Sequence, residues 1–86
     1  MPRLADWMEI ADVQFLARFA DAEEALPVAV IAEQTHYPVE YAERRCRLLA
    51  EEGLVQPVGA GVYELRELGA AFLDGDIDAD RLRRGG

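Results

Sequence analysis

Several residue types are absent from this 86-residue chain or occur only once. It has no lysine, serine or asparagine, and single copies of threonine (Thr35), histidine (His36) and cysteine (Cys46). A serine nucleophile, a Schiff-base lysine and a Gly-Lys-Ser/Thr phosphate loop are therefore excluded within the chain. One cysteine can form neither an internal disulfide nor a cysteine-rich zinc site. Cys46 with His36 is the remaining nucleophile–base pair, and helical spacing places Cys46 in the core. We expect no enzyme activity, no cofactor and no metal.

Long hydrophobic runs are also absent. No apolar run approaches the ~18 residues that would span a bilayer, and Asp6 and Glu9 interrupt the N-terminus too early for a secretory signal. Eighty-six residues leave no room for two cores. We expect one cytoplasmic domain over residues 1–86, with frayed ends at 1–5 and 83–86.

The charge is strongly one-sided, with 9 arginines against 17 acidic residues and a net charge of −8. An acidic surface whose cations are all arginines is typical of a halophile, because such a surface stays hydrated in molar salt, where the Debye length is about 3 Å. An ordinary acidic protein is the alternative. Three of the nine arginines, Arg44, Arg45 and Arg47, lie within four residues.

A helix is expected to begin at Asp6 or shortly after it and to end near Asp21. Asp6 and Glu9 have the Asp-x-x-Glu spacing of a capping box. Apolar residues then repeat at intervals of three and four, which is typical of a helix with one buried face. That face is predicted to hold Ile10, Val13, Leu16 and Ala20, flanked by Phe15 and Phe19, with Asp12, Gln14 and Arg18 on the other side.

Two further helices, joined by a turn, are expected over residues 27–33 and 39–52. Pro27 and Pro38 each stand where proline is favoured, at the first residue of a helix. Gly53 can adopt the left-handed conformation that ends many helices.

A β-hairpin is predicted over residues 54–65, because two β-prone runs flank a Gly-x-Gly tip. Pro57 has no amide proton to donate, so its strand should lie at a sheet edge. A fourth helix is expected over residues 67–73, ended by Gly75, and a last short helix over 77–82.

This order of elements is that of a winged helix-turn-helix, a mainly α fold with a small β-hairpin (α+β). It has a three-helix core, the hairpin as a wing, and a C-terminal helix. The core is predicted to hold Val13, Leu16, Phe19, Ile31, Ala42, Cys46, Leu49 and Phe72.

Four segments also resemble a known family: Trp7-Met8, residues 37–54, residues 58–63, and residues 68–78 with their Gly75-Asp76-Ile77-Asp78 ending. The chain resembles haloarchaeal winged-helix regulators related to the repressor of the halophage phi-H. The resemblance implies a small sequence-specific DNA-binding transcriptional regulator, with a repressor as the expected type. The wing tip, Gly59-Ala60-Gly61, departs from a DNA-binding wing because it carries no basic residue.

The helix over 39–52 is the one expected to enter the major groove. Counting 100° per residue from Ala42 places Cys46 and Leu49 on its buried face and Arg44 and Arg47 opposite. Arginine is the commonest reader of guanine and also binds phosphates. The predicted DNA-binding residues are Tyr37, Glu40, Tyr41, Arg44, Arg45 and Arg47. In the alternative interpretation these arginines pair with neighbouring glutamates at helical spacing, each pair contributing only ~0.2–0.5 kcal/mol.

Double-stranded DNA is the expected partner, with no membrane and no small-molecule substrate. A homodimer is also expected, because Trp7-Met8 and residues 72–82 carry apolar side chains beyond the needs of a three-helix core. The main alternative is a winged-helix module that binds another protein and no nucleic acid. A third alternative is an acidic mimic of DNA.

Overall fold

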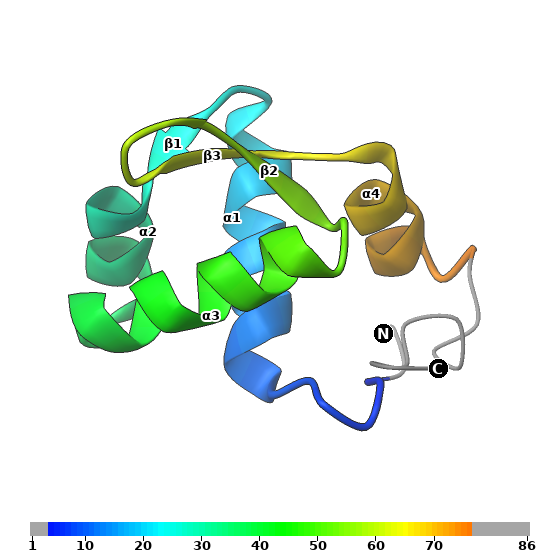
Figure 1. Ribbon diagram of the computed structural model, residues 1–86. Helices are drawn as coiled ribbons and strands as arrows, with labels where there is room; N and C mark the ends of the chain where they lie inside the picture. The colour runs from blue at the N-terminus through cyan, green and yellow to red at the C-terminus, as the bar shows by residue number, and fades with distance from the viewer. Residues whose placement is uncertain (1–3, 77–86) are drawn as a thin grey trace.

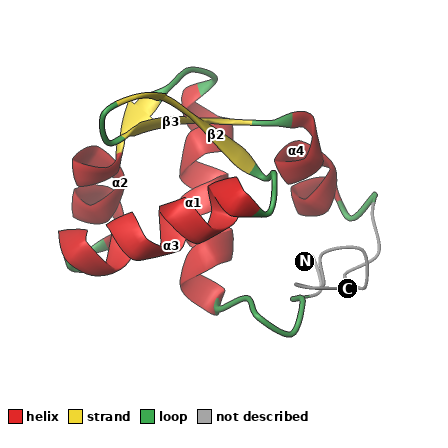
Figure 2. Ribbon diagram, in the orientation of Figure 1, coloured by secondary structure: helices red, strands yellow, loops and turns green. Residues whose placement is uncertain are grey.

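Residues 4–76 are described by the computed structural model of the protein, and they form a helical core covered on one side by a small sheet (Figures 1 and 2). The elements in chain order are α1 (Ile10–Ala22), β1 (Leu26–Pro27), α2 (Val28–Thr35), α3 (Val39–Glu51), β2 (Val55–Gly59), β3 (Val62–Leu65) and α4 (Glu67–Asp74).

α1 is the central helix and contacts α2, α3 and α4. Figure 1 shows α3 crossing in front of α1, with α2 and α4 on opposite sides. The predicted core is largely confirmed: Val13 is partly buried, and Leu16, Phe19, Ile31, Ala42, Cys46, Leu49 and Phe72 are buried. Burying one such large side chain stabilises a fold by about 1.5–3 kcal/mol, so these residues hold the four helices together.

α1 begins a few residues after Asp6, as predicted, but its capping box joins Glu9 and Asp12 and not Asp6 and Glu9. The helix begins at Ile10 with Glu9 as its N-cap, and the backbone N–H of Glu9 donates to Asp12 Oδ2 at 2.9 Å. Ile10 is 69% exposed, whereas Asp12 is fully buried. Two phenylalanines, Phe15 and Phe19, lie at the centre of the buried face. The side chains of Phe15 and Phe19 bury more apolar area than those of Ile10 and Ala20, so the phenylalanines decide which face of α1 is buried.

The helix-turn-helix is close to the prediction. Pro27 and Pro38 are N-caps, each one residue before the first helical residue. His36 ends α2 in a left-handed conformation with φ of 63°. The reversal from α2 to α3 therefore takes three residues, 36–38, and the two helices pack against each other.

The hairpin forms as predicted, and β1 completes a three-stranded antiparallel sheet in the order β1-β3-β2. β2, with Pro57, is an edge strand as expected. The strand β1 was not predicted, because two residues are too few to show an alternating pattern. The tip of the hairpin is anchored at the start of α2, where the Val28 N–H donates to the Gly61 carbonyl at 2.8 Å. The wing is therefore short and lies back on the domain.

α4 packs closely on the base of the hairpin and ends at Gly75 in a left-handed conformation. Ala5 and Met8, from the segment before α1, are buried in the same core. The predicted helix over 77–82, the predicted frayed residues 83–86 and residues 1–3 lie outside the described residues. The frayed N-terminal end was predicted over 1–5, and this is wrong at Ala5, which is buried. Among residues 4–76, no helix is long and apolar enough to cross a membrane.

Candidate nucleic-acid interface

The outer face of α3 carries charges of both signs. Its inner face is fixed in the core by Ala42, Cys46 and Leu49, which are fully buried. Helical geometry then turns the residues between them toward solvent. The exposed residues of this outer face are Val39, Glu40, Glu43, Arg44, Arg47 and Glu51.

Arg44 is linked to the start of α1 through Tyr41. The Arg44 guanidinium carbon lies 5.9 Å from the centroid of the Tyr41 ring, and the Tyr41 hydroxyl donates to the Glu9 carboxylate. Burial, followed by the bond to Glu9, raises the pKa of Tyr41 to about 12. Tyr41 therefore keeps its proton at any ordinary pH and acts as a hydrogen-bond donor.

Three aromatic rings support this end of α3. Phe15 meets Tyr37 edge to face, with ring centroids 5.4 Å apart, and Tyr37 lies 5.6 Å from Tyr41. Pairs of this kind contribute about 0.5–1.5 kcal/mol beyond their buried area. The predicted residues Tyr37 and Tyr41 are thus half-buried and form one cluster beside the exposed Glu40 and Arg44.

Arg45 points away from the outer face and binds a buried carboxylate. Its Nε donates to Asp12 Oδ1 at 2.9 Å and its Nη2 to Asp12 Oδ2 at 2.5 Å. Nη2 also donates to the Trp7 carbonyl at 3.0 Å, and Nη1 lies 3.7 Å from Glu9 Oε2. The bond to Asp12 raises the pKa of Arg45 above its already high ordinary value. The structure therefore places Arg45 in an internal ion pair, unlike the other predicted site residues.

Sequence reasoning placed Asp12 on the wrong face of α1. An acidic side chain is normally exposed, and the cation that lets it be buried is 33 residues away in the sequence. One local signal was available: Asp12 stands three residues after the N-cap Glu9, the position from which a side chain reaches back to the N-cap amide.

The wing contributes little charge to the interface. Residues 57–62 contain no ionisable side chain, and Val58 is 50% exposed near the tip. This surface can offer only backbone groups and apolar contact.

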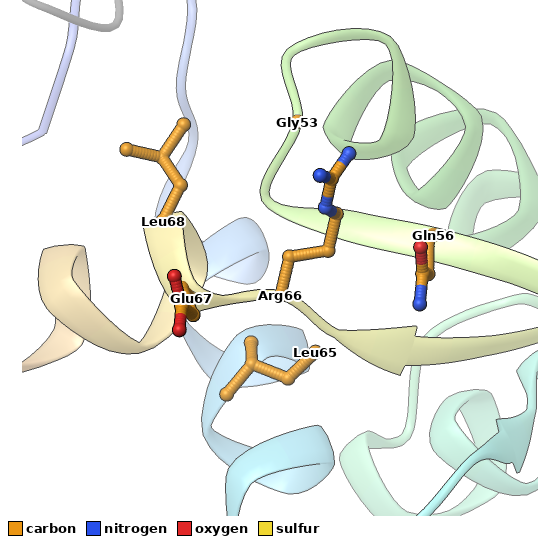
Figure 3. Close-up of a pocket in the computed structure, with 6 residues that line it drawn as sticks. All are labelled: Gly53, Gln56, Leu65, Arg66, Glu67 and Leu68. Atoms are coloured by element: carbon orange, nitrogen blue, oxygen red, sulfur yellow. The ribbon is translucent and has the colours of Figure 1, made fainter.

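A shallow depression lies at the C-terminal end of α3, where the base of the wing meets α4 (Figure 3). In Figure 3 the Arg66 side chain extends from the start of α4 toward Gly53. Arg66 is exposed at this edge of the depression. The residues that line the depression are Gly53, Gln56, Leu65, Arg66, Glu67 and Leu68. Across residues 4–76, no three His, Cys, Asp or Glu side chains gather as a metal ion would require.

A helix-turn-helix with its second helix exposed, followed by a hairpin wing, defines a winged helix-turn-helix protein. The chain belongs to the winged helix-turn-helix phage repressor family, whose model matches residues 1–85. This is a family of repressors and not of enzymes. The expected fold and the resemblance to phage repressors are therefore confirmed.

One solved structure is similar over nearly the whole domain. It is the crystal structure of the PhiH1 repressor-like protein from Haloarcula marismortui, with 30% sequence identity and a TM-score of 0.81, covering 92% of this chain and 91% of that chain. A comparison with curated protein sequences gave no match.

Proposed function

We propose that this protein is a sequence-specific transcriptional repressor that binds double-stranded DNA with α3 in the major groove. The observation that carries the proposal is the outer face of α3, where Arg44 and Arg47 are exposed on a helix whose inner face is locked in the core. Membership of a phage repressor family supports the same conclusion. A rigid helix that presents arginines is what base reading in the major groove needs.

Each residue retained in the proposed interface has a role that its chemistry suits. Arg44 and Arg47 donate to guanine O6 and N7 or to phosphates, and Glu40 accepts from the amino group of cytosine. Tyr37 and Tyr41 lie at the side of the helix, where they contact the sugar-phosphate backbone. The predicted contact of Arg45 with DNA is not retained in the proposal, because its guanidinium binds Asp12.

The protein is proposed to work in concentrated salt. A body with a net charge of −8 repels DNA, and this repulsion acts over long range. Molar salt screens it to a few ångströms, while contacts at hydrogen-bond distance persist. The similarity to a protein from Haloarcula marismortui supports this setting.

A homodimer remains part of the proposal, on narrower grounds. Met8 and Phe72 are buried in the chain's own core, so they no longer argue for a partner. Ile10 is the most exposed large apolar residue described, and the half-buried Trp7 lies near it in sequence. A dimer would place two copies of α3 one helical turn apart, about 34–36 Å, on a palindromic site. Light scattering at high micromolar concentration tests it, and a monomeric mass would overturn it.

The function is tested by selecting sites from a pool of randomised duplex DNA in molar potassium chloride. We expect the parent protein and the Arg18→Ala variant to enrich the same sequence, because Arg18 is exposed on α1 outside the proposed interface. The Arg44→Ala/Arg47→Ala variant should enrich none.

Enrichment of no sequence by the parent would contradict the proposal. The glutamates that alternate with the arginines on α3, Glu40, Glu43 and Glu51, would then favour a protein partner with a basic surface.

A further inference from the structure

We propose that Arg45 is a positioning residue for DNA recognition: its ion pair with Asp12 sets the orientation of α3 against α1, and its guanidinium does not touch DNA. This inference rests on the proposed function of α3. It assigns to Arg45 and Asp12 a task different from that of Arg44 and Arg47.

The ion pair joins segments that are far apart in the sequence. Arg45, in the middle of α3, binds the carboxylate of Asp12 through two nitrogens and the carbonyl of Trp7 through one of them. Asp12 also accepts from the Glu9 amide and so caps α1. One guanidinium therefore clamps the segment before α1 and the first turn of α1 onto α3.

The geometry of this clamp resists rotation of α3. Two parallel N–H···O bonds fix both the distance and the plane of the guanidinium relative to the carboxylate, which a single bond cannot do. Arg44 and Arg47 belong to the same helix, so a rotation that breaks the Arg45 pair would also move both of their side chains. A bidentate contact with a guanine edge loses its alignment with such a movement.

Arg45 cannot serve DNA without abandoning Asp12. Asp12 is fully buried and the Arg45 side chain is 15% exposed. Turning the guanidinium toward a phosphate would leave a buried carboxylate without its cation, one of the costliest changes a protein interior can undergo. Glu9 adds a second negative charge beside the guanidinium: one of its carboxylate oxygens lies 3.7 Å from Arg45 Nη1 and the other accepts from the Tyr41 hydroxyl.

The Arg45→Lys variant separates positioning from phosphate contact. Lysine keeps the positive charge, so Asp12 stays paired and the protein folds, but an ammonium cannot form the paired bonds of a guanidinium. A phosphate contact would survive this change, because counterion release counts lysine and arginine alike. Arg18→Lys on α1 is the matched control.

Binding is measured for the duplex selected above and for a scrambled duplex of the same composition, across a range of salt. We expect Arg45→Lys to lose about tenfold or more in affinity for the selected duplex, as one misaligned base contact would cost. Affinity for the scrambled duplex should stay within about twofold, because phosphate contacts are unchanged. The salt slope should match that of the parent.

A second pair of measurements needs no DNA. Residual dipolar couplings of backbone amides report the angle between α1 and α3, and we expect this angle to change in Arg45→Lys and not in Arg18→Lys. In the parent, the Arg45 Nε–H should exchange with water more slowly than those of Arg44 and Arg47.

Three results would overturn the proposal. One concerns the Asp12→Leu/Arg45→Met variant, which removes both partners of the ion pair. If this variant loses affinity equally for both duplexes and its salt slope falls by about one unit, Arg45 is a phosphate contact. Another is an Arg45→Lys variant with parental affinity and an unchanged angle. The third is a parent that binds no duplex: the proposed function and the role of Arg45 in DNA recognition then fail together, whatever the angle between α1 and α3 is in Arg45→Lys. The first two results contradict the role of Arg45 alone.

Discussion

Three arginines lie within four residues of α3, and each has different surroundings. Arg45 forms an ion pair with a buried carboxylate, Arg44 lies over the Tyr41 ring, and Arg47 is exposed. Their chemical identity is the same, so their environments decide their roles. An arginine beside a buried acid serves the fold, whereas an arginine on an outer helix face is free to serve a ligand.

The hydrogen bond from Tyr41 to Glu9 gives a prediction at this scale. In Glu9→Gln, the pKa of Tyr41 should fall from about 12 toward its ordinary value of 10.0, because a neutral amide removes the negative charge that opposes loss of the proton. The remaining burial should keep the pKa above 10.0. Nuclear magnetic resonance titration of ring-labelled tyrosine measures it. An unchanged pKa would mean that the hydroxyl does not bond to Glu9.

At the scale of elements, the contact of α4 with the hairpin depends on Gly69. A Cβ atom added there would lie 2.3 Å from the Leu54 carbonyl oxygen and 2.7 Å from Leu65 Cδ1. We expect Gly69→Ala to lower the free energy of unfolding by about 1–3 kcal/mol despite alanine's better helix propensity. Urea unfolding measures the change.

Gly59→Ala in the wing is the matched control for that substitution. Its added Cβ would meet only Val62, at 3.9 Å, which is ordinary contact. Its stability should stay at the parent's value or rise by about 0.4–1 kcal/mol, because alanine restricts the unfolded chain. If Gly69→Ala and Gly59→Ala have equal stability, then α4 does not pack on Leu54 as described.

Elements bounded by local signals were the predictable part of the fold. Pro38 and Gly53 predict a helix over 39–52, which differs from α3 by one residue at its end, and the Gly-x-Gly tip locates the hairpin. These signals act through the backbone of a few neighbouring residues, so they can be read without the fold.

Features set by distant partners could not be predicted in the same way. β1 is two residues long and forms only because it pairs with Val62 and Tyr63. Asp12 is buried only because Arg45 reaches it from another helix. For the same reason, periodicity identified Arg44 and Arg47 as outward-facing but gave no sign of the contacts of Arg45 and Tyr41.

For the whole molecule, the buried thiol of Cys46 makes the free energy of unfolding fall at alkaline pH. Burial raises the pKa of Cys46 from 9.0 to about 12, so the folded state favours the protonated thiol. Its contribution is fully present below the unfolded pKa and is lost as pH rises through the window from about 9 to about 12, by at most about 1.4 kcal/mol per pH unit.

Cys46→Ala removes this titration. We expect the variant to be less stable than the parent at pH 8, since it leaves a small cavity, but to lose less stability between about pH 9 and pH 12. Tyrosines that titrate in the same range are present in both proteins and cancel in the comparison. Parallel pH dependences in urea unfolding would contradict the burial of a neutral thiol.

The outer face of α3 is proposed to bind DNA although the protein as a whole carries a net charge of −8. A salt titration of one selected duplex with the parent, Arg44→Ala and Arg47→Ala decides whether it does. A variant that has lost a base contact should bind about 1–3 kcal/mol more weakly and lose its preference at one base position. A variant that has lost a phosphate contact should bind all sequences more weakly, and its salt slope should be flatter by about one unit.

Added salt should weaken binding by the parent less than its number of phosphate contacts implies, because salt also screens the repulsion between DNA and its −8 charge. If both variants bind like the parent at every salt concentration, α3 does not read DNA.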